Sequence, residues 1–141
     1  MKYDAIEIWK EGEDGEDEFI CSAIVAMKDG IPFHGEMPCR KAHIDPDVID
    51  ACLEAIPPTD IYPEFPKDFT EALPESISDT DYIKVADLRS YGLDRQGVAK
   101  LVREEARVYE YLNKQPHQNI VKYRGCVVRD GLITGLALAR Y

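Results

Sequence analysis

Two charged residues stand in stretches whose pattern is otherwise apolar. Residues 94–113 carry apolar side chains at helical spacing, and Glu105 lies three or four positions from apolar neighbours on both sides, so it projects from the apolar stripe of the expected helix. A buried carboxylate is costly without a cation beside it. Lys84 lies in the middle of DYIKVADL, residues 81–88, which alternates like a strand. We therefore predict a Lys84–Glu105 ion pair. The alternative is a Glu105 carboxylate at the edge of the stripe, in water.

A further set of residues has the chemistry of metal ligands. Two thiols and two imidazoles suffice for a tetrahedral zinc site, and the candidates are Cys21, His34, Cys39 and His43. Structural zinc sites usually take two ligands from one tight turn, and this spacing lacks such a pair. We therefore expect no metal site. The cysteines form no CxxC pair, which favours reduced, partly buried thiols at Cys21, Cys39, Cys52 and Cys126.

Composition and charge exclude several classes of function. The chain has 141 residues, enough for one domain with a modest core, and a formal net charge of −10. Nucleic-acid binding requires clustered Lys and Arg, and the sequence has no basic stripe. No segment has the length of a membrane span or the apolar stretch of a signal peptide. We expect no nucleic-acid or membrane partner and a cytoplasmic location, with the nucleus as the intracellular alternative.

The N-terminal residues predict an antiparallel hairpin and a third strand. Apolar-rich runs at residues 3–9 and 19–27 flank a stretch with six acidic side chains and two glycines. We interpret this stretch as a solvated loop, and an acidic interaction surface is the alternative. A third extended piece is expected at residues 31–37, after the turn signal Asp29-Gly30.

A short helix and a proline-rich stretch follow. Asp45-Pro46 supplies an N-cap and a first-turn proline for an amphipathic helix over residues 46–55. Between Ile56 and Pro74 the chain carries five prolines among large apolar side chains. We predict an extended strap, residues 56–80, which its aromatic side chains pin to the domain. The alternative is a proline-rich ligand for another protein.

The remaining sequence predicts strands around one principal helix. A strand over residues 81–88 precedes the helix 94–113, and strands over 120–129 and 132–141 are joined by the hairpin turn Asp130-Gly131. The helix has an apolar stripe of Val98, Leu101, Val102, Val108, Tyr109 and Leu112. Its polar side consists of Lys100, Arg103, Glu104, Arg107, Glu110 and Lys114.

The order of these parts resembles the small lobe of a eukaryotic protein kinase. In that family a strand lysine contacts the nucleotide phosphates, the next helix carries the glutamate that pairs with it, and an HPNIV connection leads into two further strands. Here Lys84, Glu105 and HQNIV at residues 117–121 follow in that order. The sequence HQNIVKYRGCVVRDG and the proline-rich stretch before Lys84 are similar to those of a divergent kinase-like branch common in fungi. The resemblance covers roughly residues 56–141.

The resemblance implies a set of site residues. Lys84 and Glu105 match the catalytic pair, and Tyr82 stands where the family has a small alanine against adenine. Ala139 matches the gatekeeper, and Arg140-Tyr141 matches the start of the hinge whose backbone binds adenine. The implied cofactors are ATP and Mg²⁺, and the implied activity of a complete parent is phosphotransfer to Ser or Thr of a protein substrate.

Two departures from the family pattern limit this expectation. No GxGxxG precedes Lys84, and the sequence ends at the expected hinge, so the large lobe with its HRD and DFG motifs is absent from these 141 residues. We expect no catalysis by this chain as given. The main alternative is a pseudokinase or truncated interaction module, which binds a partner protein or self-associates through its exposed face. The third reading is an unrelated α+β domain that binds a partner through the acidic loop.

The predicted fold class is α+β, a protein-kinase-like small lobe with an antiparallel sheet and one main helix, preceded by a hairpin and a short helix. The predicted division is an N-terminal extension over residues 1–55, the strap over residues 56–80 and the lobe over residues 81–141.

Overall fold

A computed structural model of the chain describes residues 2–115 and 117–139. The fold is α+β, as predicted, and its strands form one antiparallel sheet of four strands and another of three. The chain divides into two compact units. The N-terminal unit comprises the residues up to Pro57 together with Leu88–Arg95, and the lobe unit comprises Pro58–Asp87 and the residues from Gln96 onward. Each unit has an apolar cluster of its own among the described residues.

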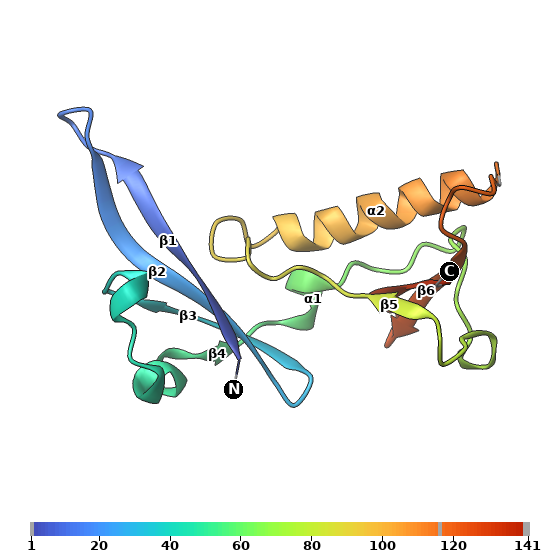
Figure 1. Ribbon diagram of the computed structural model, residues 1–141, viewed down its shortest axis with the longest axis horizontal. Coiled ribbons are helices and arrows are strands. Elements are labelled where there is room, and N and C mark those ends of the chain that lie inside the picture. The colour runs from blue at the N-terminus through green and yellow to red at the C-terminus, as the bar shows by residue number, and fades with distance from the viewer. Residues whose placement is uncertain (1, 116, 140–141) are drawn as a thin grey trace. The chain divides into compact units, whose positions relative to one another are not determined.

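The N-terminal unit contains the predicted hairpin and third strand. Strands β1 (Tyr3–Glu11), β2 (Asp17–Lys28) and β3 (Ile31–Met37) pair in sequence order, and the two-residue strand β4 (Glu54–Ala55) adds to β3 (Figure 1). Both β1 and β2 extend beyond the predicted bounds into the acidic residues. Cross-strand pairs such as Lys10 with Glu18 support this extension.

The helix predicted over residues 46–55 is shorter and of a different type. Residues Pro46–Cys52 form a 3-10 helix, preceded by another at Lys41–His43. The predicted cap is present, because the Asp45 carboxylate accepts the N–H of Asp47 at 2.9 Å. The last predicted turn is missing because Glu54 and Ala55 pair with β3 instead. A buried side chain of this segment, Ile49, packs with Ala5, Ile24 and Ile44 in the N-terminal core.

The lobe unit is a three-stranded sheet with one principal helix. Its strands are β5 (Tyr82–Lys84), β6 (Tyr123–Arg129) and β7 (Leu132–Leu138) in the order β5-β7-β6, and its helix is α2 (Gly97–Asn113) (Figure 1). The predicted turn joins β6 to β7, with left-handed φ values of 54° at Asp130 and 78° at Gly131. Strand β5 is shorter than the predicted 81–88. The last two residues of the predicted strand 132–141 lie outside the described part.

The strap packs along the lobe sheet. It contains the one-turn helix α1 (Pro58–Ile61) and a 3-10 helix at Pro74–Ser76. Isolated bridges join Glu64 to Leu132 and Glu71 to Cys126. Phe65 and Phe69 pack against the lobe core, which confirms the prediction that aromatic side chains pin the strap. From Pro58 onward the strap belongs to the same compact unit as the lobe strands and helix α2.

Helix α2 packs on the sheet through a narrower face than predicted. Val98 and Ala106 are buried, and the small side chain of Ala106 joins the core cluster of β6 and β7. Leu101 and Val108 were predicted on the apolar stripe but are 59% and 55% exposed. They lie at the border of the buried face, because helical geometry turns each about 60° or more from Val98. This border becomes part of the candidate site.

Candidate functional site

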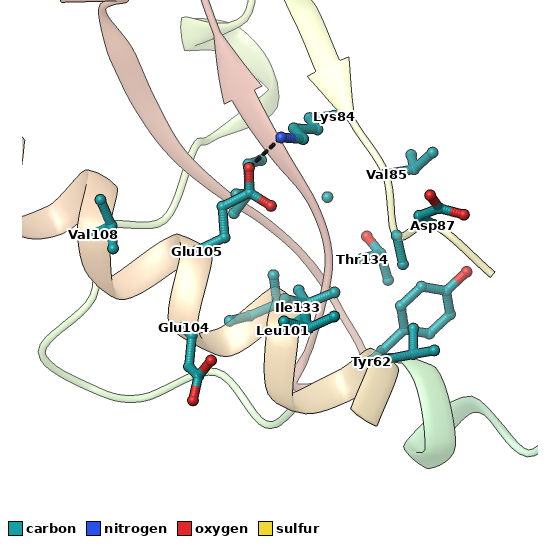
Figure 2. A pocket seen from close by; sticks show the side chains of 15 residues that line it. Tyr62, Lys84, Val85, Asp87, Leu101, Glu104, Glu105, Val108, Ile133 and Thr134 are labelled. Atoms are coloured by element: carbon teal, nitrogen blue, oxygen red, sulfur yellow. Dashed lines mark hydrogen bonds and ion pairs between the residues drawn. The ribbon is translucent and has the colours of Figure 1, made fainter. Parts of the chain in front are cut away.

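Lys84 and Glu105 form an ion pair between strand β5 and helix α2. The Lys84 ammonium donates a hydrogen bond to the Glu105 Oε1, and the two side chains point toward one another (Figure 2). Strand pairing fixes the lysine, because Lys84 lies opposite Leu136 of β7. The pairing predicted from the sequence pattern is therefore confirmed. Glu104, the neighbouring carboxylate, is exposed and points away from Lys84 (Figure 2).

The pair is only partly shielded from water. The Lys84 side chain is 42% exposed and the Glu105 side chain is 35% exposed. The hydrogen bond to the Glu105 carboxylate raises the pKa of Lys84 above its ordinary value, against the opposing effect of partial burial. Lys84 is consequently cationic at neutral pH. An ammonium carries three N–H donors, so Lys84 has the capacity to contact acceptors besides Glu105, such as anionic oxygens.

The ion pair borders a cavity of about 440 Å³, which we call the α2 pocket. Its floor is residues 133–136 of β7, and its walls are α2 and residues 84–87 (Figure 2). Gly135 permits the close approach of the lysine strand, since a Cβ there would lie 2.9 Å from Ile83 Cγ2 and 3.2 Å from the Lys84 carbonyl oxygen. Tyr62 of the strap also lines the pocket.

The other predicted nucleotide-site residues are only partly described. Tyr82 is opposite Leu138 in the β5–β7 register and is 46% exposed. It shares a sheet face with Lys84, two residues away. Ala139 follows β7, and its N–H donates to the Lys122 carbonyl at 2.8 Å. Arg140 and Tyr141 lie outside the described residues.

Glu110 has a structural role that the sequence pattern did not indicate. The sequence pattern predicted Glu110 on the polar side of α2. In the structure its carboxylate accepts the Thr70 N–H at 2.6 Å, the Thr70 hydroxyl at 3.1 Å and the Tyr123 hydroxyl at 2.9 Å. Burial raises the pKa of Tyr123, which therefore stays protonated and donates this hydrogen bond. The partners of Glu110 come from the strap and from β6, at sequence separations that helical periodicity does not register.

The zinc candidates form no metal site in the described part of the chain. Across residues 2–115 and 117–139, no cluster of three or more His, Cys, Asp and Glu side chains has an arrangement that could hold a metal ion. All four cysteines are free thiols, and Cys126 is fully buried. Among these same residues, no helix is both long enough and apolar enough to cross a membrane.

Comparisons of the chain with models of protein families, with curated proteins and with solved structures find no match in any of the three. The kinase resemblance therefore stays a prediction, carried by the residues themselves.

Proposed function

We propose that the lobe unit is the small lobe of a protein-kinase-like protein and contacts the phosphates of ATP through Lys84. The observation that carries the proposal is the Lys84–Glu105 pair, formed between a strand and the following helix. Phosphoryl-transfer enzymes of this kind use such a pair to position a cation for the phosphates. The chemistry at Lys84 agrees, because its ammonium is charged and exposed on one side.

Glu105 acts on the nucleotide through Lys84. Its carboxylate keeps the Lys84 side chain in one rotamer, so that further N–H donors of the ammonium can contact phosphate oxygens. Mg²⁺ would neutralise part of the phosphate charge. A complete parent carrying HRD and DFG motifs would transfer phosphate to Ser or Thr of a protein substrate in the cytoplasm or nucleus. These 141 residues contain neither motif, so we expect no phosphotransfer from them.

A second candidate function is that of an interaction module without nucleotide binding. The observation that favours it is the absence of a GxGxxG sequence before Lys84, so that no glycine-rich backbone covers the phosphates. In this case Lys84 and Glu105 form a structural ion pair, and the exposed apolar side chains beside them bind a partner protein or a second copy of the chain.

A titration of the isotopically labelled chain with Mg-ATP, followed by amide chemical shifts, separates the two candidates. Nucleotide contact predicts saturable shifts that centre on β5 and the facing residues of β7. Lys84→Met removes these shifts, and Glu105→Gln weakens them. Lys100→Met is the matched control, because this exposed lysine lies on α2 away from the pair. Equal responses in Lys84→Met and the unsubstituted chain would overturn the nucleotide role and leave the interaction module.

A further inference from the structure

We propose that the outer edge of strand β1 pairs with the same edge of a second copy of the chain, in an antiparallel arrangement around a two-fold axis. Strand β1 is the first strand of the four-stranded sheet, and across residues 2–115 and 117–139 the only strand it pairs with is β2. This edge belongs to the N-terminal unit. The inference therefore goes beyond the proposed nucleotide role of the lobe unit and does not depend on it.

Strand β1 lacks most of the features that prevent pairing at a sheet edge. Edge strands are commonly short, or carry lysine, proline or a bulge. Strand β1 has nine residues without a proline, YDAIEIWKE, whereas an average strand has about five or six. The irregularity between Ile8 and Trp9 adds a residue to β2, where Ile20 is skipped in the register, so β1 itself continues without interruption. Its outward backbone groups can therefore form a continuous ladder with another strand.

A two-fold axis at Glu7, the middle residue of β1, gives the longest ladder. All nine residues then overlap over roughly 30 Å, with about eight to ten backbone hydrogen bonds. In this register Asp4 is opposite Lys10 of the second copy, Ile6 is opposite Ile8, and the symmetry repeats each pair. These four side chains alternate onto one face, so opposed ones lie about 5 Å apart. Moving the axis by one residue places a charge opposite an isoleucine. The longest register is thus also the one that pairs opposite charges, which favours a second copy over an unrelated strand.

The side chain on the axis is already neutralised within its own chain. The two Glu7 carboxylates would face each other there. Each accepts hydrogen bonds from the Arg40 side chain at 2.7 Å and from the Lys41 N–H at 2.9 Å. The Arg40 guanidinium is held in place further by the Trp9 ring, whose centroid lies 4.6 Å away. Pairing at Glu7 therefore brings together two ion pairs and not two bare carboxylates.

The antiparallel arrangement also separates the most acidic parts of the two chains. Six carboxylates gather at residues 11–18, which span the end of β1, the turn and the start of β2. Because the end of β1 in one copy lies beside the start of β1 in the other, these stretches stand at opposite ends of the ladder, roughly 30 Å apart. Repulsion at that distance is largely screened, since the Debye length at physiological ionic strength is about 8 Å. The opposed Asp4–Lys10 pairs lie within this length and therefore dominate the charge interaction.

Sedimentation equilibrium of the full chain, from about 1 μM to about 1 mM, measures the dimer and its Kd. Trp9 is the only tryptophan of the chain and is 42% exposed, so its fluorescence should shift to shorter wavelength as the dimer forms. Asp4→Lys and Lys10→Asp each place like charges opposite one another twice, and each should raise the Kd about tenfold. The double variant Asp4→Lys/Lys10→Asp should restore it. The two residues are about 20 Å apart within one strand, so this restoration requires a second copy.

A matched control separates this pairing from the effect of net charge. Glu36→Lys makes the same charge change as Asp4→Lys at an exposed residue of β3, and it should not raise the Kd. Asp4 and Lys10 are both exposed, and circular dichroism verifies that each variant is folded. A chain that stays monomeric at the highest concentration, equal Kd values for Asp4→Lys and Glu36→Lys, or a double variant that remains weak would each overturn the proposal. A monomer whose Trp9 fluorescence shifts when a peptide of alternating valine and lysine is added would assign the edge to a basic strand of another protein, and would also overturn it.

Discussion

The Glu110 carboxylate on helix α2 accepts the backbone N–H of Thr70 at 2.6 Å, which ties the strap to the helix. The same carboxylate accepts the Tyr123 hydroxyl from strand β6. One side chain thus joins three segments that are far apart in the sequence. Helix α2 also carries Glu105, so this contact helps to place the carboxylate that pairs with Lys84 of β5.

Replacing Glu110 with alanine should loosen the lobe unit, because a Thr70 N–H and the Tyr123 hydroxyl lose their acceptor. The expected loss is roughly 1–3 kcal/mol, which corresponds to an opening about 5- to 150-fold more frequent. Cys126 is fully buried in the same unit, so its rate of alkylation, followed by mass spectrometry, reports this opening. Glu104→Ala, exposed on the same helix, should leave the rate unchanged. Equal rates in the two variants would contradict the role of Glu110.

Gly125 is predicted to tolerate no side chain. It has a φ of 136°, and a Cβ there would lie 2.7 Å from the Ala72 nitrogen and 2.8 Å from the Thr70 carbonyl oxygen. Gly125→Ala should therefore cost about 2 kcal/mol or more in unfolding free energy. Gly131→Ala is the control, because its φ of 78° imposes strain but no atom lies within 4 Å of its Cβ. Urea unfolding that gives the same loss for both would show that the strap does not confine Gly125.

The Glu7–Arg40 pair should make the stability of the N-terminal unit sensitive to acid. Hydrogen bonds from the Arg40 side chain and the Lys41 backbone N–H lower the pKa of Glu7 from 4.5 to about 2. Because the folded-state pKa is depressed, the stabilising contribution is complete above pH 4.5 and disappears as the pH falls through about 2. Arg40→Ala should raise the Glu7 pKa in a carboxyl NMR titration. Lys10→Ala, a control on the same strand, should not. An unmoved pKa in Arg40→Ala would refute the pairing.

The Lys84–Glu105 pair should contribute little to stability, and this contribution should be lost at alkaline pH. Both side chains are more than a third exposed, so solvent screening limits the pair to about 1 kcal/mol at most. The pKa of Lys84 is raised, and its contribution is therefore complete below the ordinary value of 10.5 and lost as the pH rises beyond it. Urea unfolding of Lys84→Met at neutral and alkaline pH measures this. A loss of several kcal/mol at neutral pH would show that the pair is mainly structural.

Local patterns in the sequence predict much of this fold. Apolar-rich runs predict β1 and β2, and the Asp29-Gly30 turn signal predicts β3. The Asp130-Gly131 turn predicts the β6–β7 hairpin, and the apolar stripe predicts α2. The Lys84–Glu105 pair was predictable because a carboxylate on an apolar stripe requires a partner, and a strand lysine was available.

Properties that depend on tertiary packing were not predictable in the same way. The width of the buried face of α2 is set by contact with the sheet. Leu101 and Val108 were therefore predicted within this face but lie at its border. The 3-10 helix Pro46–Cys52 stops short of the predicted residue 55 because Glu54 and Ala55 pair with β3. Glu110 was assigned to solvent because its partner Thr70 is separated from it by 40 residues. Helical periodicity contains no information about such a contact.

The strap also covers an edge of the lobe sheet at which another molecule could otherwise pair. Its residues 70–72 exchange backbone hydrogen bonds with Cys126, at 2.7 Å from the Cys126 N–H to Thr70 and 2.8 Å from the Ala72 N–H to Cys126. These contacts occupy the outer edge of β6, where an uncovered strand would invite pairing with another molecule. At the opposite edge, β5 is only three residues long and ends in Lys84. The strap thereby protects the lobe unit against edge-to-edge aggregation, a form of protection that Gly125 makes possible by letting the strap lie so close.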